Sequence, residues 1–248
     1  MRPSEILQTV SHRELPPPAS PWVMTQTWLD LLFAHWPLSP DALRSHIPSI
    51  LDIDTFDEQA WVGVVPFRMR DVHPRWLPSV NGISHFPELN VRTYVTYKGY
   101  PGVYFFSLEA ANPIAVAIAR SVFHLPYFNA RMTCERQGDT IYYSSHRTHR
   151  GARPADYLAK YRPIAPVDYA KRGSIAHWLT ERYSLYTTFH NSLYRGEIHH
   201  VQWPLQPAEL EIQKDTMALS HGIQLPDTKP LLHFSEQQEV LIWPLQRM

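Results

Sequence analysis

Acidic and basic side chains stand inside an otherwise largely apolar block that runs from His85 to Met132. Glu88 and Arg92 are four residues apart at the start of a predicted strand, so both side chains point to the same face of that strand. If this face lines a cavity, Arg92 is placed to anchor a carboxylate or enolate ligand, and Glu88 to carry a proton. Spacing alone favours the alternative, a structural ion pair at the end of a sheet.

The same block contains further candidates for a ligand site. Glu109 follows a second predicted strand, and Arg120 lies on a predicted helix, where an arginine ordinarily faces solvent. Tyrosine hydroxyls could furnish a pocket wall, although aromatic residues on strands more often belong to the core. The tyrosines concerned are Tyr94, Tyr104, Tyr127, Tyr142 and Tyr143.

Other kinds of site are disfavoured by spacing. The closest histidine pairs, His146 with His149 and His199 with His200, fall on opposite faces of a strand, so we expect no metal site. The sequence has no GxSxG nucleophile motif and no glycine-rich phosphate loop, and we expect no cofactor. The single cysteine, Cys134, excludes an intramolecular disulfide and is expected to be a half-buried small residue.

These residues must be positioned by a strand, a hairpin turn, a second strand, a helix and a third strand. Alternation predicts the first strand at 91–97, turn residues occupy 98–102, and an apolar run predicts the second strand at 103–108. Asn112 as N-cap and Pro113 at the first helical position predict a helix that Leu125-Pro126 ends.

The rest of the chain is also predicted to be rich in strands and hairpins. Predicted strands lie at 23–36, 60–70, 131–136, 140–147, 185–189, 193–203 and 240–245. Predicted helices lie at 39–47 and 175–183. A turn or two of helix is allowed within 2–12 and a short helix at 150–162, and helix is slightly favoured over strand at 209–219. Residues 73–81 are expected to form a loop, for which a lid over a cavity mouth is one interpretation. With nine to eleven strands and three or four short helices, we expect an α+β fold that is mainly antiparallel β, as a sheet or barrel.

Composition limits the class of protein. The 248 residues carry 23 basic and 23 acidic side chains, which gives no reason to expect nucleic acid as a partner. No apolar stretch approaches the roughly 20 residues of a membrane helix, and 1–21 lack the apolar core of a signal peptide, so a cytoplasmic protein is expected. We predict a proline-rich N-terminal arm at 1–21 and a single domain at 22–248, with homo-oligomer formation left open.

Five segments of the sequence carry a family resemblance: QTWLDLLFAHWPL near the start, PELNVRTYV, GYPGVYFFSLEA and the AxxxAR…LPY run in the central block, and VLIWPL near the C-terminus. Together they resemble the YqjF-like family of uncharacterised bacterial proteins. The family is similar in fold to the acetoacetate decarboxylase-like superfamily. The resemblance therefore implies a barrel-like antiparallel β fold with a ligand cavity and short flanking helices.

The resemblance also bears on chemistry. The decarboxylases carry an arginine-containing helix followed by a Pro-Lys step, and that lysine forms a Schiff base with a keto acid. Here Arg120 and Pro126 match the arginine and the proline, but Tyr127 stands at the lysine position. Schiff-base decarboxylation is therefore not expected. Glu88 resembles an acidic residue of the superfamily's cavity, which favours the pocket interpretation over the structural ion pair.

The sequence thus predicts a protein, enzyme or binder, whose cavity takes an acidic or carbonyl-bearing small molecule. The ligand-binding candidates are Glu88, Arg92, Arg120, Tyr127, Glu109 and Tyr94. The alternative is a non-catalytic sensor or oligomeric scaffold with a vestigial cavity. These two hypotheses differ in whether Glu88, Arg92 and Arg120 converge on one pocket.

Overall fold

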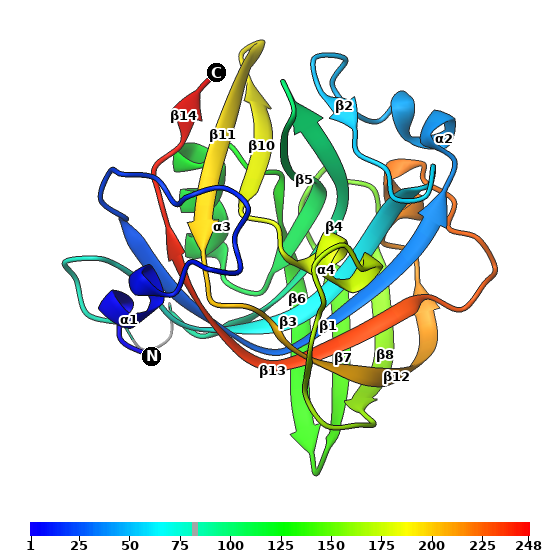
Figure 1. Cartoon of the computed structure of the whole chain (residues 1–248). Coiled ribbons are helices and arrows are strands. Elements are labelled where there is room, and N and C mark those ends of the chain that lie inside the picture. Colours follow the sequence, from blue (N-terminus) through cyan, green and yellow to red (C-terminus); the bar gives the residue numbers. More distant parts are fainter. Residues whose placement is uncertain (81–83) are drawn as a thin grey trace.

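The computed structural model describes residues 1–80 and 84–248 (Figure 1). Its strands are β1 (Met24–Leu38), β2 (Asp52–Ile53), β3 (Ala60–Pro74), β4 (Phe86–Tyr97), β5 (Tyr100–Ala110), β6 (Tyr127–Gln137), β7 (Thr140–Arg147), β8 (Asp156–Pro163), β9 (Asp168–Tyr169), β10 (Ser184–Phe189), β11 (Ser192–His199), β12 (Pro204–Asp215), β13 (Leu231–Ile242) and β14 (Gln246–Arg247). Its helices are α1 (Pro3–Gln8), α2 (Pro40–Arg44), α3 (Pro113–Val122), α4 (Ile175–Thr180) and the 3₁₀ helix η1 (Leu219–His221).

The prediction of a mainly β fold with short helices is confirmed. Within the described ranges, none of the helices is long and apolar enough to cross a membrane.

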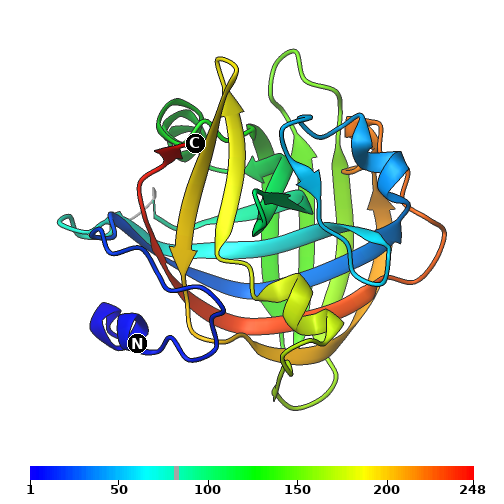
Figure 2. The ribbon, with the colours of Figure 1, turned by 45° about the horizontal axis from the view of Figure 1, so that its top comes forward.

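The strands form one sheet whose pairings close into two circuits. One circuit runs through β5, β6, β7, β8, β12, β13, β1, β3 and β4, and the pairing of β4 with β5 closes it. The other leaves β5 through β10 and β11 and returns by the pairing of β11 with β13. Both circuits use β13, β1, β3, β4 and β5, and Figure 2 shows β1, β3 and β13 as long curved strands across the molecule. These five strands are a wall with a different compartment on each face.

Local sequence explains the central part of this wall. Lys98 and Gly99 both have positive φ, at 50° and 78°, which is the backbone of a two-residue type I′ turn between β4 and β5. At the start of α3, the Asn112 side chain accepts hydrogen bonds from the backbone N–H groups of Ile114 and Ala115, at 3.0 and 3.2 Å. The predicted strand, turn, strand, helix and strand of this block are therefore confirmed.

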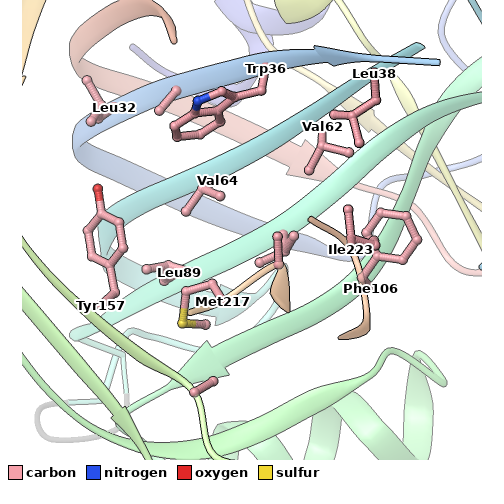
Figure 3. Packing of buried hydrophobic residues seen from close by; sticks show 14 of the residues in the cluster. Leu32, Trp36, Leu38, Val62, Val64, Leu89, Phe106, Tyr157, Met217 and Ile223 are labelled. Carbon is pink, nitrogen blue, oxygen red and sulfur yellow. The ribbon is translucent and has the colours of Figure 1, made fainter. Parts of the chain in front are cut away.

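The first circuit encloses a filled hydrophobic core. Val62 and Val64 of β3 pack there with Leu89, Val91 and Val95 of β4, all without measurable exposure (Figure 3). Large aromatic side chains complete the same cluster: Tyr143 of β7 and Tyr157 and Tyr161 of β8 come from strands outside the wall, and Phe234 comes from β13. The odd-numbered residues of β4 therefore supply packing energy, since burial of such apolar side chains is the main favourable contribution to folding.

Two segments differ from their predicted secondary structure. The short helix allowed at 150–162 is wrong, because the segment ends in β8, where Tyr157, Ala159 and Tyr161 are buried in alternation. The helix favoured at 209–219 is also wrong, because β12 continues to Asp215 along β8. This pairing joins parts of the chain far apart in sequence, and local propensity does not report it.

Other boundaries shift less. The expected loop at 73–81 begins later, because β3 continues to Pro74, and Asn81 lies outside the described residues. The strand expected at 240–245 is the end of a longer strand, β13, which begins at Leu231. The helix expected at 175–183 ends at Thr180, and the Ser174 hydroxyl caps its start by accepting from the backbone N–H of His177 at 3.3 Å.

The N-terminal segment packs on the rest of the molecule through α1. Ile6 of this helix is buried in a small cluster with Trp22, Leu241 and Trp243. Further along, a ring nitrogen of His12 lies 2.9 Å from the backbone carbonyl oxygen of His200. The division into an N-terminal arm and one domain stays a prediction.

Candidate functional site

A cavity of about 290 Å³ lies on the second face of the shared wall. It is bounded by β1, β3, β4 and β5, by α3, and by β10, β11 and the chain near them. Most of its lining is apolar, with aromatic rings such as Phe33, Phe67 and Phe105. Its lining side chains that carry polar atoms are Gln26, Glu88, Asn90, Arg92, Tyr127, Thr180, Arg182, Ser184, His200, Trp28 and Trp203. An apolar pocket with a few placed polar groups is the usual form of a small-molecule site.

β4 carries the polar stripe of the cavity. Glu88, Asn90 and Arg92 alternate with the core residues of the same strand, and all three line the cavity. The Cα atoms of Glu88 and Arg92 are about 13 Å apart at the usual rise of a strand. Each side chain has other partners, so the structural ion pair between Glu88 and Arg92, the alternative that spacing favoured, is wrong.

Glu88 and Tyr127 form a buried hydrogen-bonded pair at one end of this stripe. The Tyr127 hydroxyl donates to Glu88 Oε2 at 2.7 Å, and Glu88 is only 2% exposed. Burial raises the pKa of Glu88 to about 8; nearby Glu109 also raises it, while the Tyr127 hydrogen bond opposes the shift. Burial, together with Glu88, holds the pKa of Tyr127 well above its usual value. Both groups are therefore neutral at pH 7. Because the Tyr127 hydrogen is donated to Glu88, the protonated carboxyl of Glu88 is the group of this pair that can donate a hydrogen bond or a proton to a ligand.

Arg92 presents a positive charge at the other end of the stripe. Its Nη2 donates weakly to the Tyr94 hydroxyl at 3.3 Å and to the Leu179 carbonyl at 3.5 Å. Its buried Nε finds no hydrogen-bond partner among the described residues. The guanidinium carbon lies 5.2 Å from the centre of the Phe33 ring, which forms the cavity wall. The other arginine of the lining, Arg182, does form an ion pair, with Asp54 at 2.6 Å.

Tyr94 supports Arg92 from behind. The Tyr94 hydroxyl donates to the Leu179 carbonyl at 2.9 Å. His35 Nε2 lies 2.6 Å from the hydroxyl oxygen of Tyr94. Burial, with a contribution from Arg92, lowers the pKa of His35 well below its usual value, so this histidine is neutral and donates from Nε2. Tyr94 is fully buried and is not among the lining residues, so its place is behind the cavity wall.

Besides Tyr94, two more of the predicted site residues lie outside the cavity lining. Arg120 is on the exposed side of α3 and donates to the backbone carbonyl of Tyr127 at 2.6 Å. Glu109 is buried in an ion pair with Arg147 and accepts a hydrogen bond from Ser107 at 3.1 Å. Burial raises the pKa of Glu109 to about 7, although Arg147 opposes the shift. The structure thus brings Glu88, Arg92 and Tyr127 to one cavity, but not Arg120 or Glu109.

Sequence reasoning missed the part of the cavity that comes from the C-terminal third of the chain. Thr180, Arg182, His200 and Trp203 all line it. They arrive there because β10 runs parallel to β5 and because β11 pairs with the end of β13. Neither pairing leaves a local sequence signal. The sequence draws attention to His200 only as the neighbour of His199, in a pair that is expected not to share a metal ion. The two side chains have different surroundings: His200 lines the cavity, whereas a ring nitrogen of His199 contacts Arg13.

Metal and thiol chemistry find no support in the geometry. Within 1–80 and 84–248, no group of three or more His, Cys, Asp or Glu side chains is placed to hold a metal ion. Cys134 is half-buried, and burial raises the pKa of its thiol to about 12, so the thiol is a poor nucleophile.

Residues 25–239 match the family model DUF2071, whose description is "uncharacterized conserved protein". The chain belongs to the DUF2071 family. It is 51% identical to the uncharacterized protein YqjF of Bacillus subtilis over 226 residues, which are 91% of this chain and 93% of that protein. The family resemblance read from the sequence is confirmed.

Solved structures similar to this DUF2071 protein are acetoacetate decarboxylase-like. Acetoacetate decarboxylase from Legionella pneumophila has a TM-score of 0.63 at 16% identity, with 98% of this chain and 94% of that chain covered. The enduracididine biosynthesis enzyme MppR complexed with pyruvate has a TM-score of 0.63 at 11% identity, with 94% and 93% covered. An acetoacetate decarboxylase-like enzyme from Sphingomonas wittichii has a TM-score of 0.62 at 12% identity, with 95% and 97% covered. At these identities the similarity establishes the fold, and the predicted fold class is confirmed.

Proposed function

We propose that this DUF2071 protein binds a small acidic or carbonyl-bearing molecule in the cavity beside β4. Arg92 holds the negative charge of the ligand, and the neutral Glu88–Tyr127 pair donates a hydrogen bond or a proton to its carbonyl group. The observation that carries the proposal is an arginine in an apolar cavity wall whose guanidinium has only weak neutral partners.

The energetics of Arg92 support an anionic ligand. A charge that is partly withdrawn from water is costly unless it is paired or well hydrogen-bonded, and the half-buried Arg92 makes two long hydrogen bonds and leaves its buried Nε unpaired among the described residues. A carboxylate satisfies a guanidinium through two parallel charge-assisted bonds. Arg182 lies in the same lining, but Asp54 balances its charge at 2.6 Å, so Arg92 is the arginine available to an anionic ligand.

The energetics of Glu88 support a carbonyl or another acceptor on the ligand. A carboxyl that keeps its proton near neutral pH can donate to an oxygen that gains negative charge, as in enolisation of a keto acid. The MppR structure in complex with pyruvate, a keto acid, is an example of this fold with a ligand of the proposed class. If the protein is an enzyme, we therefore propose proton transfer next to a carbonyl group as its chemistry.

Schiff-base chemistry is not part of the proposal. The lining residues in the described part of the chain include no lysine. The lysines of the chain lie in turns or along exposed strand segments; they are Lys98, Lys160, Lys171, Lys214 and Lys229. Tyr127 in the cavity beside Glu88 supports the idea that a tyrosine stands where the decarboxylases have their lysine.

The test is calorimetric titration of the wild-type protein with a panel of short monocarboxylates, 2-keto acids and 3-keto acids. We expect at least one acid to bind, and Arg92→Ala to weaken it about tenfold or more, because charge-assisted hydrogen bonds are lost. Arg131→Ala is the matched control, since Arg131 is exposed on β6 and outside the cavity lining. Equal affinity for wild type and Arg92→Ala would contradict the role of Arg92.

The same experiment separates this proposal from the scaffold hypothesis. If no acid binds, and native mass spectra of the purified protein show only the bare chain in an oligomer, a non-catalytic scaffold explains the protein better. A small acid or carbonyl compound retained in those spectra would support the cavity and identify its ligand class.

A further inference from the structure

A second polar group lies in the same cavity, on the short segment after β11. His200 and Trp203 both line the cavity, with 0% and 2% exposure, and their ring centres are 5.1 Å apart. Neither residue belongs to the Glu88–Tyr127 pair or to the surroundings of Arg92. The proposed function leaves them without a role.

His200 offers a hydrogen-bond acceptor to the cavity. Its Nδ1 lies 2.7 Å from the Val201 carbonyl oxygen, and because a carbonyl oxygen can only accept, Nδ1 carries the hydrogen. Gln238 Nε2 also approaches Nδ1, at 3.3 Å, but makes its shorter bond to the Val201 carbonyl, at 2.6 Å. Burial lowers the pKa of His200 to about 3, so the ring is neutral. Its Nε2 is then an acceptor, and it has no partner in the described structure.

Trp203 offers a hydrogen-bond donor. Its indole Nε1–H can only donate, and no acceptor for it occurs among the described residues. The residue is held from other sides, because its backbone N–H donates to Glu181 at 3.0 Å and its ring packs edge-on against Phe33 at 4.9 Å. The indole is therefore fixed, and a buried donor without a partner costs free energy.

We infer that His200 and Trp203 form a second subsite, which takes a hydroxyl group of the ligand. A hydroxyl is the small group that donates one hydrogen bond and accepts another, so it satisfies His200 Nε2 and Trp203 Nε1–H together. The inference rests on the proposed function and narrows its ligand to a hydroxylated organic acid.

Phe33 connects the two subsites. Arg92 lies over this ring, with its guanidinium carbon 5.2 Å from the ring centre, and Trp203 packs against the same ring at 4.9 Å. A ligand with its carboxylate on Arg92 can therefore pass along Phe33 and place a hydroxyl at Trp203. The ligand class is thus an acid whose hydroxyl is separated from its carboxylate by an apolar spacer.

The test uses pairs of straight-chain carboxylates with and without a terminal hydroxyl, over a range of chain lengths, in calorimetric titrations. We expect the hydroxyl to improve affinity about tenfold or more at one chain length, because the unsubstituted acid leaves two buried groups unpaired. Trp203→Phe removes the indole N–H together with part of the ring, and it is expected to abolish this hydroxyl preference, so that the hydroxylated and unsubstituted acids of each pair bind equally. Trp76→Phe is the matched control, because Trp76 is 82% exposed.

Each outcome bears on a different statement. Equal binding of both acids of every pair by wild type would overturn the subsite, would leave the proposed function standing, and needs no variant to fold. Failure of every acid to bind would overturn the proposed function and the subsite with it. A hydroxyl preference that survives in Trp203→Phe would overturn the assignment to Trp203.

Discussion

The two faces of β4 differ in kind. Leu89, Val91 and Val95 meet a filled core, whereas Glu88, Asn90 and Arg92 face a cavity. Asn90 and Arg92 each have a buried polar atom without a hydrogen-bond partner among the described residues. Because successive residues of a strand point to opposite sides, one backbone serves both compartments. The packed face supplies stability. The cavity face gives up some stability, as functional sites commonly do.

The largest expected effect contrasts these faces directly. Leu89→Ala should lower the free energy of unfolding by about 2–5 kcal/mol, because it leaves a hole in a close-packed core. Asn90→Ala, one residue away, should change it by less than about 1 kcal/mol, because the Asn90 side-chain oxygen has no partner among the described residues. Urea denaturation of both variants measures the contrast. Similar losses for the two variants would contradict the distinction between the faces.

The second prediction concerns Glu88 and pH. Its pKa of about 8 in the folded protein lies above the unfolded value near 4.5, so between these values the folded state keeps a proton that the unfolded state loses. The wild type should therefore lose stability relative to Glu88→Gln as pH rises from 5 to 8, at up to about 1.4 kcal/mol per pH unit.

Urea midpoints of wild type and Glu88→Gln, measured at several pH values from 5 to 8, check this slope. Glu135→Gln is the control for loss of one carboxyl, because Glu135 is exposed on β6. A stability difference between wild type and Glu88→Gln that stays constant over this range would show that Glu88 is not held neutral by the cavity.

A smaller effect is expected at the helix that covers the cavity. Asn112→Ala should destabilise the protein by about 1 kcal/mol, because it removes the N-cap of α3. Hydrogen exchange should then accelerate at the first turn of α3 more than in β4. Uniform acceleration in both elements would mean that α3 does not open separately from the wall.

The smallest effect is expected at Arg120. Arg120→Ala should leave the affinity for any acid ligand unchanged within about twofold and cost less than about 1 kcal/mol, since exposed side chains contribute little. Calorimetric titration beside Arg92→Ala gives the comparison. A loss of affinity as large as that of Arg92→Ala would bring Arg120 back into the site.

The sequence predicted those features that depend on neighbouring residues. Asn112-Pro113 and Lys98-Gly99 determine local backbone geometry, and the period of two put Glu88 and Arg92 on one face. For Arg120, the ordinary interpretation of a helical arginine, exposure to solvent, agrees with the structure, whereas its place among the site candidates does not. The sequence could not decide between the two, because the orientation of α3 depends on its packing. It could not predict His200 and Trp203 either, because only pairings between distant strands bring them to β4.

Because both faces of the shared wall are used, the protein should be sensitive to insertions and deletions of single residues within the wall strands. A single-residue insertion within β4 would shift the alternation downstream, so that Arg92 would move toward the hydrophobic cluster and Val91 toward the ligand. Substitutions at the cavity-lining residues of β4, Glu88, Asn90 and Arg92, can diversify ligand preference with less harm to folding than substitutions in its core-facing residues. Gains and losses of residues should therefore be confined to the loops, while new specificities arise by exchange of side chains within strands of fixed length.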